Sequence, residues 1–576
     1  MQALMIASWQ ATTFAPFKSR IFLAIWIASL VSNFGSLIQA VGASWLMTSI
    51  APSPDTVALV QALTALPILL LALPAGAIAD IWDHRLTMLI ALALNLIASA
   101  VLATVVYFGH ITPWTLLAFT FVLGCGVALY SPAWQSSVGD QVPRGEVPAA
   151  VSLNSLAANL SQTVGPAIGG AIVALAGPAM AFALNSVTYV GLIVVLMSWR
   201  RERAIPVLPP ESMPLAMQAG VRYVLHSPAI RAVLLRAFFF GLLGSATWAL
   251  MPLIARNLLG GSAVTYGILF GAFGVGAVIG SLSSSLMRQR RSNHAIITLA
   301  STAFGAMSVA IAFSSHVALT AVLLSVSGLS WIWTLSTLNI TVQISSPRWV
   351  VGRALAMYQM TIFGGLAAGS WLFGELASAQ GIGMSLIVAG IAMVLLATFG
   401  FKLRLPQAAH LKLDPFRTTL APPNMTAEVV PQSGPVVVMV EYQIAAEDRD
   451  AFMIAMRELR RIRRRNGAQR WTLLQDVDDL SRWTERFQCP TWLEYLRQRQ
   501  RLTLADSEVA LKAQSFHRGA NPPRVRHQLE RTPTAASNAK SEAERISERA
   551  SVVDPYLPAV AMPVAGENAG PGGGAA

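Results

Sequence analysis

Polar and aromatic side chains that could bind a small molecule lie inside long apolar segments of the first 404 residues. A hydrogen-bonding group in such a segment is costly unless it faces a cavity or a neighbouring helix. A mixture of Trp, Tyr, Asn and Gln suits an amphipathic or aromatic ligand, although hydrogen bonding between helices is the commoner role for any one residue. The candidates for a ligand pathway are Asn33, Gln39, Gln61, Asn154, Asn159, Gln162, Asn185, Tyr189, Trp248, Trp331, Trp333, Asn339, Tyr358 and Gln359.

Residues for covalent, metal or cofactor chemistry form no comparable pattern. Two cysteines, Cys125 and Cys489, are too few for a disulfide or metal framework. None of the five lysines follows a glycine, so the chain has no Walker A motif and ATP hydrolysis is not expected. We therefore predict no catalytic residue, no metal site and no cofactor.

Charge is scarce and unevenly distributed along the chain. Charged residues make up 12% of the 576 residues, against roughly 25% in an ordinary soluble domain, which excludes a plain soluble enzyme. Residues 1–404 contain 18 basic and 8 acidic residues, whereas residues 405–576 contain 23 and 20. We therefore expect the first region in a lipid bilayer and the second in water.

Twelve apolar segments before residue 405 approach or exceed the ~20 residues that a membrane-spanning helix needs. With the N-terminus in the cytoplasm, sixteen Lys and Arg residues fall on the inner side and only Arg256 on the outer side. This asymmetry predicts a multi-pass membrane protein with both termini cytoplasmic. The segments are 20–46, 56–79, 86–108, 112–134, 147–176, 178–199, 229–256, 263–287, 293–314, 317–343, 350–378 and 381–401.

An internal repeat relates the two halves of this region at an offset of 204 residues. Each half contains six of the segments, in the same order and with the same sidedness, which predicts a parallel repeat about an axis along the membrane normal. The matching positions are Gly76 and Gly280, Pro143 and Pro347, and Gly165 and Gly369.

The loop after the second segment reads Gly76-Ala-Ile-Ala-Asp80-Ile-Trp-Asp83-His84-Arg85. A glycine there permits two helices to approach closely, and an aspartate can accept from a helix N-terminus or an arginine. We predict a gating loop made of Gly76, Asp80, Asp83 and Arg85 that latches one closed state. A loop that only sets the topology is the alternative.

The fifth segment contains Gly165-Pro166-Ala-Ile-Gly169-Gly170. Small residues allow tight helix packing, and a proline frees a carbonyl and favours a kink. We therefore predict a helix-packing motif formed by Gly165, Pro166, Gly169 and Gly170.

The loop resembles the signature loop of the major facilitator superfamily, and the Gly-Pro motif resembles one that the exporters of this family carry in their fifth span. Residues 14–404, which include VALVQALTALPILLLALPAGAIAD, look like the branch that contains the enterobactin exporter. The resemblance implies twelve spans and a location in the bacterial inner (plasma) membrane. It also implies a secondary transporter that exports siderophore- or drug-like molecules by alternating access, driven by protons. The alternatives are a transporter fused to a small enzymatic or ligand-binding module, and an importer or lipid flippase of the same fold.

Some residues depart from the family pattern, and these departures bear on energy coupling. Ile81 stands where the family has a basic residue, and the fourth segment lacks the arginine of many proton antiporters. The charges that remain in or beside the segments are Asp140, Arg236 and Glu375. Each of these suits a structural role better than proton transfer.

The C-terminal region predicts a small soluble domain. Strands are expected near 436–444, 470–476, 481–488 and 523–530, and helices near 446–465, 490–500 and 503–516, which is a ferredoxin-like order. The domain resembles dimeric α+β barrel modules of the antibiotic-biosynthesis monooxygenase type, which implies a homodimer or a regulatory role. Some such modules are enzymes, but we find no convergent catalytic set among Tyr442, Trp471, Trp492 and His517.

The expected fold class is an all-α membrane protein with twelve transmembrane helices in two parallel six-helix repeats, followed by the α+β domain. The expected partners are a small-molecule substrate, membrane lipids and a second copy of the chain, without nucleic acid. The expected parts are an N-terminal bundle (1–199), a cytoplasmic linker with an amphipathic helix (200–228), a C-terminal bundle (229–404), a linker (405–434), the α+β domain (435–531) and a disordered tail (532–576).

Overall fold

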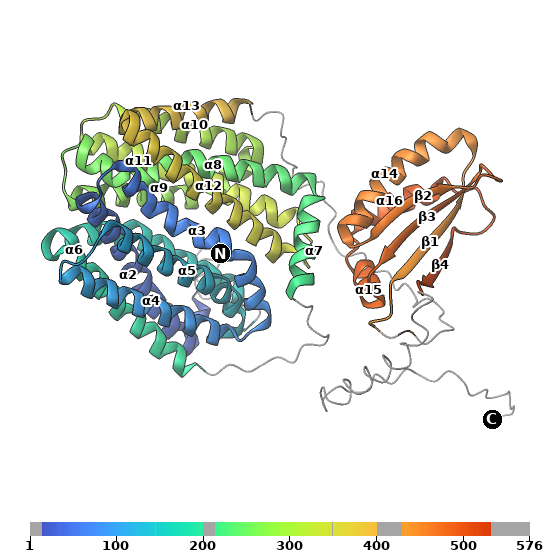
Figure 1. The fold of residues 1–576 in the computed structure, drawn as a ribbon, viewed down its shortest axis with the longest axis horizontal. Coiled ribbons are helices and arrows are strands. Elements are labelled where there is room, and N and C mark those ends of the chain that lie inside the picture. The colour runs from blue at the N-terminus through green and yellow to red at the C-terminus, as the bar shows by residue number, and fades with distance from the viewer. Residues whose placement is uncertain are drawn as a thin grey trace, which may run out of the picture.

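The computed structural model describes residues 14–143, 146–199, 213–347, 349–399, 429 and 431–531. Within these residues, long helices form one large body, and a smaller domain built on a sheet lies beside it (Figure 1). The tail predicted at 532–576 lies outside the described residues, as do the linker residues 200–212 and 400–428.

Nine helices in the described residues are long and apolar enough to cross a membrane, in keeping with a multi-pass membrane protein. Two more helices, α12 (Val351–Gln380) and α13 (Ile382–Phe399), pack with them. The nine are α2 (Arg20–Ile50), α3 (Pro54–Ile81), α4 (His84–Tyr107), α5 (Pro113–Gln141), α6 (Val147–Ser198), α8 (Pro228–Leu253), α9 (Ala263–Arg290), α10 (Asn293–Ala312) and α11 (Val317–Ile344).

Short polar residues mark where several of these helices begin. The hydroxyl of Ser19 accepts from the backbone N–H of Phe22, and Thr112 forms a capping box with Thr115. Inside α6, Gly177 has a φ of 81°, which suits glycine because no Cβ is present, and Pro178 follows it. The backbone of α6 is therefore two helical segments that meet at Gly177.

The offset of 204 residues recurs in the helix boundaries. Helices α5 and α11 begin at Pro113 and Val317, and α6 and α12 begin at Val147 and Val351. Between the two halves, α3 packs along α12 and α6 packs along α9. The offset is 204 residues at these two pairs of helix starts, and it is 208 between Arg20 of α2 and Pro228 of α8.

A short helix, α7 (Met213–Leu225), lies between the body and the smaller domain (Figure 1). It contacts α3 from the first half and α12 from the second. We call the end of the body that carries α7 the domain face, and the opposite end, where α2 ends and α3 begins, the far face.

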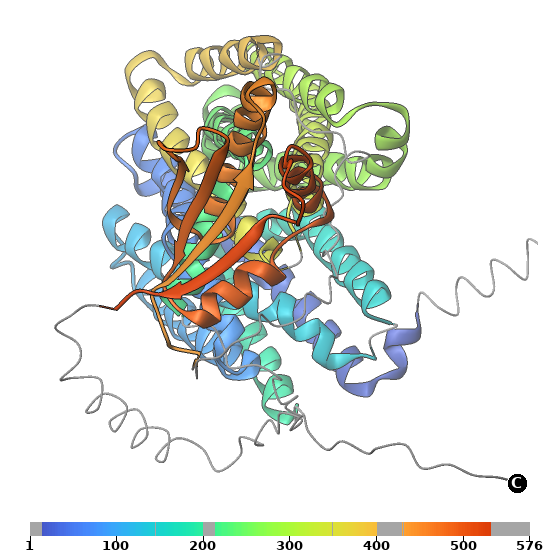
Figure 2. The ribbon, with the colours of Figure 1, turned by 90° about the vertical axis from the view of Figure 1, so that its right-hand side faces the viewer.

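The smaller domain contains a four-stranded antiparallel sheet with the order β2-β3-β1-β4. Figure 2, in which this domain faces the viewer, shows the strands side by side in front of the body. Its core includes Tyr442, Phe452 and Trp483. The elements are β1 (Val436–Gln443), α14 (Arg449–Asn466), β2 (Gln469–Gln475), β3 (Arg482–Cys489), α15 (Trp492–Gln500), α16 (Leu504–Ser515) and β4 (Arg524–Leu529).

A buried carboxylate joins α14 to this sheet. Glu485 on β3 is 0% exposed and accepts from Arg463 Nε at 3.1 Å and from Trp471 Nε1 at 2.8 Å. Burial raises the pKa of the neighbouring Tyr442, so its phenol stays neutral beside the carboxylate. A buried ion pair of this kind is stable only while both partners remain.

We predict that Glu485→Ala destabilises the small domain by about 3–5 kcal/mol, because Arg463 would be left as a buried charge without its carboxylate. Hydrogen exchange at the β1 and β3 amides of the full-length protein measures the change. Glu458→Ala is the matched control, since Glu458 is half exposed and forms a surface ion pair with the exposed Arg461. Equal protection of the β1 and β3 amides from hydrogen exchange in the two variants would contradict the role assigned to Glu485.

Candidate functional site

Two adjoining cavities lie between the halves of the helical body. The larger has a volume of about 440 Å³ and the smaller about 190 Å³, and both are lined by Gln61 and Trp248. The larger is also lined by Trp331, Ile332, Leu335, Ser336, Asn339, Tyr358, Gln359, Ile362, Phe363 and Leu366. The smaller extends among α2, α3, α5, α6, α8 and α9.

Aromatic and amide residues make up most of the lining of the larger cavity, whereas small and aliphatic residues are more numerous around the smaller one. None of the described residues that line these two cavities carries an acidic or basic side chain. Trp248 packs against Phe273, with ring centroids 4.7 Å apart, and against Trp331 at 5.8 Å. Its indole N–H is buried and has no hydrogen-bond acceptor among the described residues. An acceptor on a bound molecule would satisfy that donor, which is otherwise costly to bury.

The structure brings many of the predicted pathway residues together at these cavities. Around the larger cavity lie Gln61, Trp248, Trp331, Asn339, Tyr358 and Gln359. Around the smaller lie Gln39, Gln61, Asn185, Tyr189 and Trp248. They come from α2, α3, α6, α8, α11 and α12, so only the packing of both halves assembles them.

Several of these residues also hold helices together. Gln39 on α2 accepts from Ser99 at 2.8 Å and from Asn185 at 2.7 Å, which connects α2, α4 and α6. The hydroxyl of Tyr358 donates to the carbonyl of Leu335 at 3.2 Å. Their polar groups are therefore partly satisfied without a ligand.

Other predicted residues are not among those that line the two cavities. Asn33 and Gln162 are exposed on the body, and Asn154 and Asn159 are half-buried. Trp333 donates to Ser283 at 3.0 Å within the second half. The polar residue type alone did not separate these positions from the lining residues.

The glycines of the Gly-Pro motif lie at helix contacts. A Cβ at Gly165 would lie 3.1 Å from Leu37, and one at Gly169 would lie 3.0 Å from the Cα of Ile38 on α2. A Cβ at Gly170 would lie 2.6 Å from the carbonyl oxygen of Ala263, on α9 of the other half. The motif thus packs within the first half and across the interface.

Residues of the predicted gating loop make contacts within the first half. Asp83 caps α4 by accepting from Arg85 N at 2.8 Å, while Arg85 Nη2 donates to the carbonyl of Met197 at 2.6 Å. A Cβ at Gly76 would meet no heavy atom of the described residues within 4 Å in this conformation, so its predicted role in close helix packing remains a prediction. The side chain of Asp80 lies outside the described part of the structure.

Two of the three charged residues considered for proton transfer have partners. Asp140 Oδ2 lies 3.0 Å from His84 Nδ1, and Arg236 Nη2 lies 3.0 Å from His294 Nδ1. Glu375 is exposed on α12. None of these three residues lines either cavity.

The two halves are joined at the far face. Ser378 Oγ on α12 donates to Asp55 Oδ1 at 2.7 Å and accepts from the Asp55 backbone N–H at 3.0 Å. Arg256, in the turn after α8, donates to the carbonyl of Thr48 on α2. The sequence pointed to neither contact, because each residue reads as an ordinary helix end and its partner is more than 200 positions away.

The model of the family described as transmembrane secretion effector matches residues 11–534. The chain belongs to this family. The match reaches beyond the helical body and spans the small domain as well. The assignment to a transporter family agrees with the expectations of membrane transport and of no enzyme activity.

Curated relatives are membrane exporters and transporters. The staphyloferrin A transporter of Staphylococcus aureus is 23% identical, over 66% of this chain and 98% of the relative. The multidrug efflux pump Tap of Mycolicibacterium fortuitum is 24% identical, over 65% and 93%. The enterobactin exporter EntS of Escherichia coli is 27% identical, over 53% and 70%.

Solved structures of major facilitator transporters share the fold of the helical body. An inward-facing bacterial homologue of the human lysosomal transporter Spinster has a TM-score of 0.54 and 14% identity, over 67% of this chain and 97% of that one. A D-xylose–proton symporter has a TM-score of 0.52 and 16% identity, over 68% and 98%. At these identities the likeness concerns the fold alone.

We predict that Ser378→Ala opens the far face more often, because it removes both hydrogen bonds to Asp55. Loss of a charge-assisted bond costs about 1.5 kcal/mol or more, or roughly a tenfold shift in population. A cysteine at buried Val57, which lines the smaller cavity, reports opening through its alkylation rate. Ser49→Ala is the control, since Ser49 Oγ donates to the carbonyl of Leu46 within α2; an equal effect there would refute the assignment.

Proposed function

We propose that this protein exports small aromatic or amphipathic molecules from the cytoplasm by alternating access. The observation that carries the proposal is the uncharged, aromatic and amide-lined space between the halves. Such a space, between repeats near the middle of a membrane, is where a secondary transporter binds its substrate. The relatives named for a siderophore and for multiple drugs support a substrate of that size and character.

We propose twelve membrane spans, which are the nine long apolar helices and three further spans. The break at Gly177 divides α6 into two spans, and α12 and α13 supply one each. The 204-residue offset supports this count, since it assigns six spans to each half. On this basis residues 1–199 and 229–404 are the two bundles, joined by 200–228.

The orientation rests on the positions of basic residues. Arg85, Arg222, Arg231 and Arg353 lie on segments at the domain face, while Arg256 is at the far face. Basic residues favour the cytoplasmic side, so we assign the domain face to the cytoplasm. On this orientation both termini of the chain are cytoplasmic as well. With the contacts between Asp55 and Ser378 closing the outer side, the conformation is inward-facing.

The driving force we propose is a proton gradient, as the fold of the relatives suggests. The cavities contribute no carboxylate among their described lining residues, so a proton carrier in the substrate site is not apparent there. Coupling would then depend on carboxylates at the faces, of which Asp55 and Asp80 each sit at one end of α3.

For the small domain we propose a ferredoxin-like fold, because the chain order of its strands and helices and the sheet order β2-β3-β1-β4 match that topology. We also propose that a second copy of the chain pairs through this domain. The boundaries 405–434, 435–531 and 532–576 remain our division of the C-terminal region.

The test of export is accumulation of aromatic siderophores and dyes in cells that lack their own efflux pumps. We predict lower accumulation with the protein than without it, and loss of the difference when a protonophore is added. Trp248→Leu should reduce the export rate about tenfold, because a bound ring loses its aromatic contact and its N–H donor.

Trp333→Leu is the matched control, since Trp333 lies outside both cavities. Unchanged accumulation across a broad panel of compounds would refute export. Equal losses in the two tryptophan variants would refute the assigned cavity while leaving export possible by another route.

For the loop after α3 we predict that Asp80→Asn slows export because a neutral amide latches a cytoplasmic closed state less firmly. Asp83→Asn is the control, because asparagine caps a helix about as well as aspartate. Initial export rates at matched expression give the comparison. A normal rate for Asp80→Asn would show that the loop has no gating role.

A further inference from the structure

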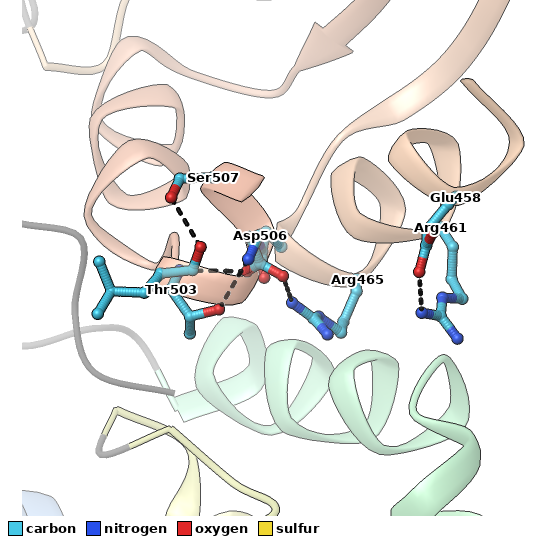
Figure 3. A network of polar contacts seen from close by, with 8 residues as sticks. Glu458, Arg461, Arg465, Thr503, Asp506 and Ser507 are labelled. Atoms are coloured by element: carbon cyan, nitrogen blue, oxygen red, sulfur yellow. Dashed lines mark hydrogen bonds and ion pairs between the residues drawn. The ribbon is translucent and has the colours of Figure 1, made fainter. Parts of the chain in front are cut away.

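The small domain contacts the helical body through α7 and through the loop between α11 and α12. The C-terminal end of α14 packs against α7. Figure 3 shows Arg465 of α14 and Asp506 of α16 beside the green helix, which is α7. Two arginines of the domain and two aromatic rings of the body take part in this contact.

Two aromatic rings of the body form the receiving surface. Tyr223 on α7 and Trp349 in the α11–α12 loop meet edge to face, with centroids 5.4 Å apart. Tyr223 is 1% exposed, and burial raises its pKa to about 12, so it remains a neutral ring at physiological pH. The two rings connect the linker helix to the second half of the body.

Two arginines of the domain cover these rings. Arg465 Cζ lies 5.0 Å from the centroid of Tyr223, and Arg501 Cζ lies 4.6 Å from that of Trp349. Both distances fall within the ~6 Å range of a cation–π interaction, which strengthens when water is excluded. Each ring therefore has its own cation, supplied by a different segment of the domain.

The domain holds both arginines in place. Arg465 Nη2 pairs with Asp506 Oδ1 at 2.5 Å, and Asp506 is 3% exposed. Arg501 is 6% exposed, lies 3.6 Å from Glu494 and donates to the carbonyl of Asn466 at 3.2 Å. These ion pairs fix the guanidinium groups before contact, so little side-chain freedom is lost when the domain docks.

The end of α14 is shaped to approach α7. Gly467 has a φ of 125°, and a Cβ at this position would lie 3.1 Å from Arg222 Nη2 and 3.5 Å from Arg501 Nη1. The positive charge of Arg222 therefore lies at the C-terminal end of α14, where the helix dipole favours a cation. A residue with a side chain would be strained there and would also crowd the guanidinium of Arg222.

The location of this contact matters for movement of the halves. Helix α7 touches α3 of the first half and α12 of the second at the domain face. On the α12 side the fit is tight, because a Cβ at Gly220 would lie 2.8 Å from the Cβ of Arg353. Rocking of the halves that closes the domain face must shift α7 against one of them.

We propose that the small domain is a brake on transport, which holds the conformation described here by clamping α7 to the α11–α12 loop through Arg465 on Tyr223 and Arg501 on Trp349. The proposal rests on the proposed alternating access. When the domain is docked, α7 and the second half move as one piece, so rocking must break the contact of α7 with α3, and this cost keeps the far face closed. Release of the domain frees α7 and lets the far face open.

The test uses the full-length protein with Tyr223→Leu and Trp349→Leu combined, which keeps apolar bulk but removes both rings. Tyr223→Phe with Trp349→Phe is the matched control, because each position keeps an aromatic face. Hydrogen exchange in α7 and in the last turn of α14 reports docking. Alkylation of Val57→Cys by a membrane-impermeant maleimide, in a Cys125→Ala background, reports opening of the far face.

Cys489 can stay in this background, because burial raises the pKa of its thiol to about 12 and keeps it unreactive. In the leucine variant we expect faster exchange in α7, and a rise of about threefold or more in both the alkylation rate and the export rate. The phenylalanine control should behave as the parent protein does.

Unchanged hydrogen exchange in α7 and α14 would show that the two rings do not hold the domain on the body. Faster hydrogen exchange with unchanged or slower alkylation of Val57→Cys would show that docking of the domain does not slow opening of the far face. Either result overturns the proposal. If the leucine variant does not fold, Arg465→Lys with Arg501→Lys tests the same contact, since lysine keeps the charge but loses the flat guanidinium. Alkylation needs no substrate, so failure to find an exported compound would refute the proposed function and not the brake.

Discussion

The absence of water from the bilayer core is the constraint on which the helical body depends. Every polar group there must find a partner within the protein or face a cavity, because an unsatisfied group costs several kcal/mol. The network of Gln39, Ser99 and Asn185 meets this demand between three helices. The indole N–H of Trp248 does not, and it lies where the two cavities adjoin.

The same constraint explains how the halves can meet and still separate. Contacts between Gly170 and α9, and between Gly374 and Ala58 on α3, bring backbones together without interlocking side chains. At the far face a few polar groups, such as Asp55 and Ser378, close the interface. Small residues and isolated hydrogen bonds make a specific contact that needs little free energy to separate, as alternating access requires.

Outside the membrane the balance is different, because water competes for every charge. The small domain excludes water from Glu485 and Asp506, and their arginines are then strong, fixed contacts. One of these arginines, Arg465, faces the linker helix. A domain built on buried ion pairs can therefore present rigid cations to the aromatic rings of the transporter.

Sequence alone determined the features that depend on residue type and periodicity. The apolar segments, the 204-residue offset and the strands of the small domain, each of which begins within one residue of the expected position, follow from local hydrophobic pattern. The pattern also supplied the polar candidates. It did not distinguish Asn33 and Gln162 from the cavity-lining Gln61 and Gln359, since all four are amides in apolar helices.

Only the tertiary structure decided which of these amides line a cavity, because that depends on how helices from both halves rotate against one another. It likewise decided that Asp83 and Arg85 cap helices, that Gly76 has open space around it, and that Asp55 meets Ser378 across 323 positions. Docking on α7 gives Arg465 of α14 an aromatic partner, Tyr223, which lies 242 positions away in the chain. Contacts between residues so far apart leave no periodic signal in the chain.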